Sequence, residues 1–166
     1  YRQAGRAGRA RTVTRAKAGA AAKPRRIGSY RIGLEAGPLA PVKKAIGKGL
    51  TEHNLAATGP YRASGYVVGV RDAKGELRGG FWVEVYYESA FLKWAWVDPR
   101  LQRKGIGRAL MAAAEEEARA RGALNLWLDT FSFQARPFYE KLGYTVFGTL
   151  KMGRAGVERY FLSKDL

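Results

Sequence analysis

The sequence predicts an α/β domain built around one mixed sheet. Its 166 residues suffice for one domain with a sizeable core, and a content of 46% hydrophobic and 12% aromatic residues is that of a globular protein. Segments with the two-residue alternation of strands are separated by segments with the apolar spacing of helices. Helices that separate strands indicate that some of the strands pair in parallel.

The ordered part is expected to begin at Ser29. Apolar residues alternate with polar or small ones over residues 30–34, which predicts a first strand. Pro41 suits the first turn of a helix, and an apolar stripe extends this helix to about Leu55.

An antiparallel meander of three strands is expected next, over residues 66–70, 77–85 and 91–97, with a turn at 72–75. Side chains in a strand alternate between the two faces of the sheet. We therefore expect three side chains of the last strand to share one face: Leu92, Trp94 and Trp96.

A long amphipathic helix is predicted from about Gly105 to Arg121, with Gly122 as its stop. Its apolar side excludes Glu115, which should lie on the opposite side and is spaced for an i,i+4 ion pair with Arg119. Beyond it we expect a strand at 124–128, a short helix at 134–142, and strands at 146–150 and 159–162.

The composition excludes several kinds of chemistry. The absence of cysteine excludes disulfides, thiolate metal sites and a cysteine nucleophile. With His53 as the single histidine, neither a zinc site nor a Ser-His-Asp triad is expected, and no metal is predicted. We find no apolar run of about 18 residues for a membrane span and no apolar signal-peptide core, so we expect a cytoplasmic protein.

The net charge of +16 is concentrated in residues 1–28. This segment holds nine of the 30 Lys and Arg residues and none of the 14 Asp and Glu, which leaves 21 basic and 14 acidic residues in 29–166, a net charge of +7. Its Ala/Gly/Arg composition lacks the bulky apolar side chains that would offset the entropy cost of folding, so we expect a disordered tail. A basic arm for nucleic acid and a targeting peptide are the alternatives.

The segment between the meander and the long helix, residues 98–108, combines glycine with positive charge at a helix start. Its glycines let the backbone turn tightly and approach a ligand closely. The free N–H groups and the positive dipole end of the helix favour a phosphate there, and Arg103, Lys104 and Arg108 add three cations. These features predict a pyrophosphate site. The spacing fits neither the dinucleotide fingerprint nor the Walker loop.

Two motifs resemble the GNAT superfamily of N-acetyltransferases. Residues 102–107, Gln-Arg-Lys-Gly-Ile-Gly, match its Gln/Arg-x-x-Gly-x-Gly/Ala signature. Residues 135–144, Ala-Arg-Pro-Phe-Tyr-Glu-Lys-Leu-Gly-Tyr, are similar to its C-terminal Ala-x-x-x-Tyr-Glu-Lys-Leu-Gly-Phe motif. Residues 96–99 resemble the end of the family's fourth strand, and the order of elements over 29–166 also agrees. The resemblance implies a GNAT-like fold and acetyl-CoA as the cosubstrate.

The resemblance also implies how acetyl-CoA would be held. The molecule would lie in a cleft where the fourth strand and the strand through Leu126 diverge, with its pantetheine arm on the backbone of Trp96 and Val97. Its pyrophosphate would bind the loop at Gln102, Arg103, Lys104, Gly105, Ile106, Gly107 and Arg108. Phe138 and Ser132 complete the expected cofactor-binding set. Ser132 stands where the family usually has Asn, and we expect it to cap the following helix.

The mechanism implied by the resemblance is direct attack of an acceptor amine on the thioester, in a ternary complex. Tyr139 matches the family's tyrosine that protonates the departing thiolate, a role typically worth about 10²–10⁴-fold. Glu84 and Glu88 are the candidates for the base that deprotonates the amine, with a solvated surface role as the alternative. His53 and Asn54 close the first helix, where the superfamily often places acceptor contacts.

The acceptor stays open at this point. Acetylation of a primary amine on a small molecule is the favoured function, and a peptide or protein amine is the alternative; acidic groups near the cleft would favour polyamine-like cations. From other classes, a nucleic-acid-binding module and a sensor that binds acyl-CoA without catalysis compete with it. GNAT proteins often dimerise, so a homodimer is also left open.

Overall fold

The computed structural model of this chain describes residues 24–35, 37–61 and 63–166. These residues divide into two compact units, Tyr1–His53 and Asn54–Leu166, and each unit is treated by itself. The predictions of disorder and of a nucleic-acid arm in the tail fall mostly on residues 1–23, which lie outside the described residues.

The first unit contains a small hairpin that the sequence only partly predicts. β1 (Arg25–Ile27) pairs antiparallel with β2 (Tyr30–Ile32) in a two-stranded sheet, and Gly28 takes φ +57° in the turn. The strand expected over 30–34 is therefore present, but order begins before Ser29. β1 was missed because two arginines in three residues give it no apolar alternation.

The first long helix, α1 (Leu39–Thr58), begins in the first unit and ends in the second. It starts two residues before Pro41 and continues three residues past the predicted end at Leu55. In the part of the chain that the structure describes, no helix is both long and apolar enough to cross a membrane.

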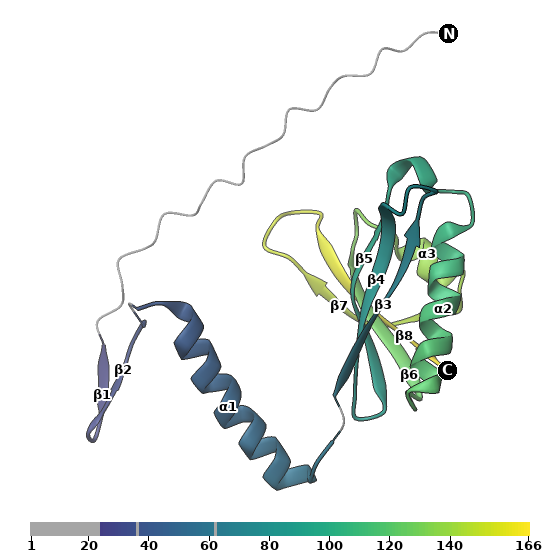
Figure 1. Cartoon of the computed structure of the whole chain (residues 1–166). Helices are drawn as coiled ribbons and strands as arrows, with labels where there is room; N and C mark the ends of the chain where they lie inside the picture. Colours follow the sequence, from purple (N-terminus) through teal and green to yellow (C-terminus); the bar gives the residue numbers. More distant parts are fainter. Residues whose placement is uncertain (1–23, 36, 62) are drawn as a thin grey trace. The chain divides into compact units, whose positions relative to one another are not determined.

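The second unit is built on a six-stranded mixed sheet, shown in Figure 1. Its strands are β3 (Ser64–Arg71), β4 (Leu77–Tyr86), β5 (Ser89–Val97), β6 (Asn125–Phe131), β7 (Thr145–Lys151) and β8 (Glu158–Asp165). They lie in the order β3-β4-β5-β6-β8-β7, and β5–β6 is the parallel pair among antiparallel neighbours. The predicted mixed sheet is confirmed, and its meander and turn fall at the predicted positions.

Helices connect the two halves of this sheet. A short 3₁₀ turn, η1 (Pro99–Leu101), and α2 (Ile106–Ala120) join β5 to β6, and α3 (Arg136–Glu140) joins β6 to β7. A crossover helix of this kind is what parallel pairing of β5 with β6 requires.

The core lies between α2 and one face of the sheet (Figure 1). It is formed by apolar side chains of α2 and of alternating strand positions: Phe81, Val83, Val85, Ala90, Leu92, Leu110, Met111, Ala114, Ala118, Leu126, Leu128 and Leu162. Because side chains alternate along β4, the residues between its core positions point to the opposite face of the sheet.

A β-bulge in β5 makes one strand prediction wrong. Trp82 of β4 pairs with Trp94, but the next residue, Val83, pairs with Leu92, so Lys93 is the extra residue of the bulge. An extra residue reverses the facing of everything beyond it. Leu92 is consequently buried in the core, whereas Trp94 and Trp96 point to the opposite face and are exposed.

Glu115 was expected on the solvent side of α2, and this was wrong. Its side chain is buried and accepts hydrogen bonds from the Tyr144 hydroxyl (3.1 Å) and from the Lys164 ammonium (2.8 and 2.9 Å). The predicted pair with Arg119 exists at 3.8 Å and is secondary to these contacts. Burial and the charge of Glu115 both raise the pKa of Tyr144, so this phenol stays protonated and keeps donating.

Replacing Glu115 should therefore destabilise the second unit. We expect Glu115→Ala to lower the free energy of unfolding by about 2–3 kcal/mol, because it leaves a buried hydroxyl and an ammonium without their acceptor. Glu116→Ala, on the exposed side of the same helix, should change it by less than about 0.5 kcal/mol. Urea unfolding of the two variants checks this, and equal losses would argue against a structural role for Glu115.

Candidate active site

Strands β5 and β6 run side by side for only part of their length. Their parallel pairing covers Ser89–Asn125 through Leu92–Leu128. Beyond these residues β5 continues to Val97 paired with β4, and β6 continues to Phe131 paired with β8. From Lys93 onward, the edge of β5 that faces β6 is therefore unpaired. The backbone groups along this edge are available to an extended ligand.

The loop after β5 is fixed at its start by Asp98. The buried carboxylate of Asp98 accepts from the backbone N–H of Arg100 at 2.9 Å, and the Arg100 guanidinium binds it at 2.6 and 3.0 Å. These hydrogen bonds lower the pKa of Asp98 to about 2, so the anchor is charged at all physiological pH values. The Asp98 N–H in turn donates to the Arg78 carbonyl on β4 at 2.8 Å.

The end of this loop presents unpaired backbone donors. Arg103 (φ +59°) and Gly105 (φ +82°) both take left-handed conformations, and Gly105 caps α2 without a side-chain hydrogen bond. The first α2 donor with an acceptor is the N–H of Ala109, which binds the Gly105 carbonyl at 3.0 Å. The N–H groups of residues 106–108 donate to no acceptor within the described part of the chain, so they are free to bind an anion.

Positive charge surrounds these donors. Arg103, Lys104 and Arg108 are exposed and form no ion pair with any residue that the structure describes. Gln102 is exposed beside them. The predicted anion-binding residues are therefore brought together at one helix start, with the free amides among them.

Gly107 connects this helix start to α3. A Cβ on Gly107 would lie 3.3 Å from the Phe138 ring, so glycine allows this ring to lie against the first turn of α2. Phe138 contacts Tyr139 edge-to-face, with ring centroids 5.1 Å apart. The two predicted α3 residues are consequently positioned by the same turn that carries the free amides.

Tyr139 is buried, yet its hydroxyl is left available. The residue is 7% exposed, and its ring contacts that of Tyr144. Within the described residues its hydroxyl has no hydrogen-bond partner, and no buried side-chain polar atom there lacks one, so the hydroxyl must reach solvent. Burial, with a smaller contribution from the charge of Asp129, raises the pKa of Tyr139 to about 12.

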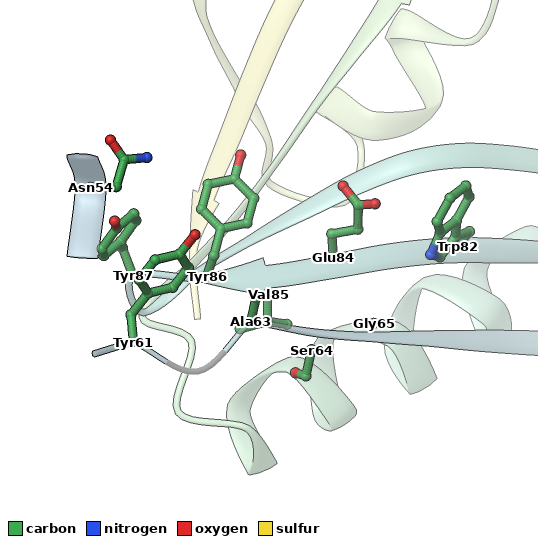
Figure 2. A pocket seen from close by; sticks show the side chains of 10 residues that line it. All are labelled: Asn54, Tyr61, Ala63, Ser64, Gly65, Trp82, Glu84, Val85, Tyr86 and Tyr87. Atoms are coloured by element: carbon green, nitrogen blue, oxygen red, sulfur yellow. The ribbon is translucent and has the colours of Figure 1, made fainter. Parts of the chain in front are cut away.

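On the sheet face opposite α2, a hollow of ≈ 620 Å³ lies beside β4 (Figure 2). Its lining is aromatic and polar: Asn54, Tyr61, Ala63, Ser64, Gly65, Trp82, Glu84, Val85, Tyr86 and Tyr87. Figure 2 shows Glu84 projecting from β4 between Trp82 and Tyr86. Of these lining residues, Glu84 alone is charged at neutral pH.

A strained turn holds the tyrosines at one end of the hollow. Tyr87 (φ +48°) and Glu88 (φ +57°) form the two-residue turn between β4 and β5, a conformation that usually calls for Asn or Gly. Tyr61 stacks on Tyr87 at 4.4 Å, and the Tyr87 and Thr58 hydroxyls are 3.4 Å apart. Strain of this kind persists where surrounding contacts hold it, often beside a functional site.

Of the remaining predicted site residues, some line this hollow and others do not. Glu84 and Asn54 line the hollow, whereas Glu88 is exposed in the turn and does not. His53 is the last residue of the first unit. Ser132 does not cap α3 as expected: Ala135 occupies that position, and the Ser132 hydroxyl instead accepts from the Glu158 N–H at 3.2 Å.

The sequence reasoning missed two residues beside Glu84. Trp82 could have been found, because its spacing of two from Glu84 along a strand places both side chains on one face. Lys93, whose ammonium binds Glu84 at 2.7 Å, reaches that face through the bulge. No signal in the sequence marks the bulge, so Lys93 could not have been found.

Comparison with known proteins gives consistent matches. Residues 44–144 match the acetyltransferase (GNAT) family. The chain is 32% identical to the blasticidin-S acetyltransferase of Streptomyces morookaense over 94 residues, 56% of this chain and 69% of that protein. It is 30% identical to the acetyltransferase Atu2258 of Agrobacterium fabrum over 125 residues, 75% of this chain and 91% of the relative. The crystal structure of an acetyltransferase from Bacillus cereus superposes with a TM-score of 0.70 at 26% identity, covering 80% of this chain and 96% of that one.

The burial of Tyr139 predicts its titration. With cosubstrate absent, we expect the Cζ resonance of Tyr139 to stay at its protonated position at pH 10, where an ordinary phenol is half-ionised, because desolvation disfavours the phenolate. Selective Cζ labelling of tyrosine and NMR at increasing pH check this, with the resonance assigned by its loss in Tyr139→Phe. A midpoint near 10 would show that the phenol is not desolvated.

Proposed function

This chain belongs to the acetyltransferase (GNAT) family, and we propose that it transfers the acetyl group of acetyl-CoA directly to a primary amine of a small molecule. The observation that carries the proposal is the junction of three features at one place: the unpaired edge of β5, the free amides at the start of α2, and the accessible hydroxyl of buried Tyr139.

The chain's own residues fit acetyl-CoA. A pyrophosphate needs several N–H donors and positive charge, and the start of α2 offers the free amides of residues 106–108 beside Arg103, Lys104 and Arg108. An amide-containing pantetheine arm needs an open strand edge, and β5 has one from Lys93 to Val97. When bound, acetyl-CoA would supply an activated acyl group as a thioester. No covalent enzyme intermediate is needed, and the chain has no cysteine to form one.

Tyr139 suits the role of general acid. A pKa of about 12 keeps the phenol protonated at neutral pH, so it can donate a proton to a departing thiolate and recover one from solvent through its accessible hydroxyl. The phenol is also held rigidly, because its ring lies between Phe138 and Tyr144.

Glu84 is the better of the two candidate bases. It lines the hollow, and its carboxylate already accepts a hydrogen bond from a primary ammonium, that of Lys93. Glu88 is exposed in the adjacent turn and outside the lining. A carboxylate that binds an ammonium can also take a proton from an amine, directly or through one water.

The hollow supports a small-molecule acceptor over a peptide. Its volume of ≈ 620 Å³ lies within the range of small-ligand sites, and aromatic side chains with a few polar groups are typical of such sites. The relative named for blasticidin S makes that compound a reasonable member of an acceptor panel. A sensor without catalysis would bind acetyl-CoA but release no CoA.

Acetyl-CoA should stabilise the protein through the start of α2. At a hundredfold excess over its Kd, the stabilisation should be about 2.7 kcal/mol, visible as a rise of several degrees in Tm. Lys104→Glu combined with Arg108→Glu should weaken binding at least about tenfold by reversing charge beside the free amides. Lys74→Glu, in the turn between β3 and β4, reverses one charge away from this site and should leave binding unchanged. An unchanged Tm in the parent protein would remove the basis of the proposal.

Release of free CoA thiol in the presence of individual amines tests the reaction itself. Tyr139→Phe should lower kcat about 10²-fold or more while acetyl-CoA still raises Tm, because only the proton donor is lost. Tyr66→Phe removes another part-buried hydroxyl, one that binds the Ala114 carbonyl on the core side, and should keep kcat within about threefold. Full activity of Tyr139→Phe would exclude Tyr139 as the acid, and thiol release that none of the amines increases would show hydrolysis of acetyl-CoA in place of acetyl transfer.

A further inference from the structure

The position of Lys93 in the second unit is not explained by the proposed reaction. It is the extra residue of the β5 bulge, at the point where β5 leaves β6. Its side chain bends back over β4, where the ammonium lies 2.7 Å from a Glu84 oxygen and 4.6 Å from the centroid of the Trp82 ring.

These contacts are those of a cation-binding subsite. Carboxylate and indole face bind a primary ammonium from two directions, and the indole attraction is strongest where water is partly excluded. Both members of the ion pair are about one-third exposed, so an exchange with another cation is sterically open. Trp82 is also held edge-to-face by Trp94 at 4.6 Å, which fixes its ring for this contact.

The pair of Glu84 and Lys93 sets the net charge of the described lining of the hollow. Glu84 is the single carboxylate among the lining residues, and Lys93 neutralises it. The other lining groups are aromatic rings, hydroxyls, an amide and small residues. A dicationic acceptor would therefore need a second carboxylate, which the described residues of the lining do not provide, whereas a neutral ring can stack on the aromatic side chains.

We infer that Lys93 is a specificity-determining residue: its ammonium fills the Glu84–Trp82 subsite and selects acceptors with one amine on a neutral, flat body over polyamines. This inference rests on the proposed function, because it names the class of acceptor for that site. It reverses the expectation that the acidic groups would favour polyamine-like cations. An acceptor amine reaches Glu84 by displacing the Lys93 ammonium, and the lining residues that the structure describes offer no second carboxylate to another cation.

The test compares spermidine with phenethylamine as probes, by calorimetric titration of the full chain. Lys93→Met keeps an unbranched side chain, one atom shorter, and removes the charge. We expect it to tighten spermidine binding about tenfold, since the ion-pair and cation–π contacts become available to the ligand and its further charges no longer meet an ammonium. Phenethylamine also gains the freed contacts but carries no further charge, so its binding should tighten by about threefold at most, and an equal gain for both amines would contradict the selectivity. Lys93→Met with Glu84→Gln should lose the gain.

Lys74→Met removes the same charge from an exposed turn and should leave both affinities unchanged. Equal gains in Lys74→Met and Lys93→Met, no gain in Lys93→Met, or a gain that survives Glu84→Gln would each overturn the inference. Lys93→Gln repeats the test if Lys93→Met lowers Tm. Acetyl-CoA titrated into the same samples distinguishes failure of the proposed function from failure of the inference on Lys93. Absence of acetyl-CoA binding refutes the proposed function. Normal acetyl-CoA binding without the spermidine gain refutes the role of Lys93 alone.

Discussion

The divergence of β5 from β6 is the constraint on which the rest of the site depends. Two parallel strands that stay paired satisfy each other's backbone groups and leave nothing for a ligand. Here pairing stops at Leu92 and Leu128, and the bulge at Lys93 begins where it stops. A bulge bends its strand and increases the local twist, so one extra residue both opens the strand edge and turns a lysine toward the opposite face.

The same divergence links the two halves of the proposed chemistry. On the α2 side, the loop after β5 is anchored by Asp98 and ends at free amides. Against the first turn of α2 lies Phe138, and next to it Tyr139. On the opposite side, Glu84 and the aromatic hollow face away from the core. The proposed direct transfer needs the acceptor amine at Glu84 and the thioester at Tyr139 to meet where β5 and β6 diverge.

The sequence predicted the parts of this arrangement that depend on local periodicity and on motif. The meander, α2, the short helix and the order of elements follow from alternation, from apolar spacing and from glycine stops such as Gly122. The features that the sequence could not predict depend on strand register and on contacts between residues far apart in the sequence. The burial of Glu115 requires Tyr144 and Lys164, which come from later in the chain. The side chain of Trp94 points away from the core because of a bulge, and the Ser132 hydroxyl accepts from the Glu158 N–H instead of capping α3.

The two catalytic candidates, Tyr139 and Glu84, lie in different surroundings. Tyr139 lies among apolar and aromatic neighbours, which disfavour the phenolate and preserve a proton for donation. Glu84 lies on an open face, where its carboxylate accepts a hydrogen bond from the Lys93 ammonium. The proposed reaction moves two protons: Glu84 would take one from the acceptor amine, and Tyr139 would give another to the departing thiolate. Because the acceptor's ammonium must replace that of Lys93 to reach Glu84, binding and deprotonation of the amine would occur at the same carboxylate.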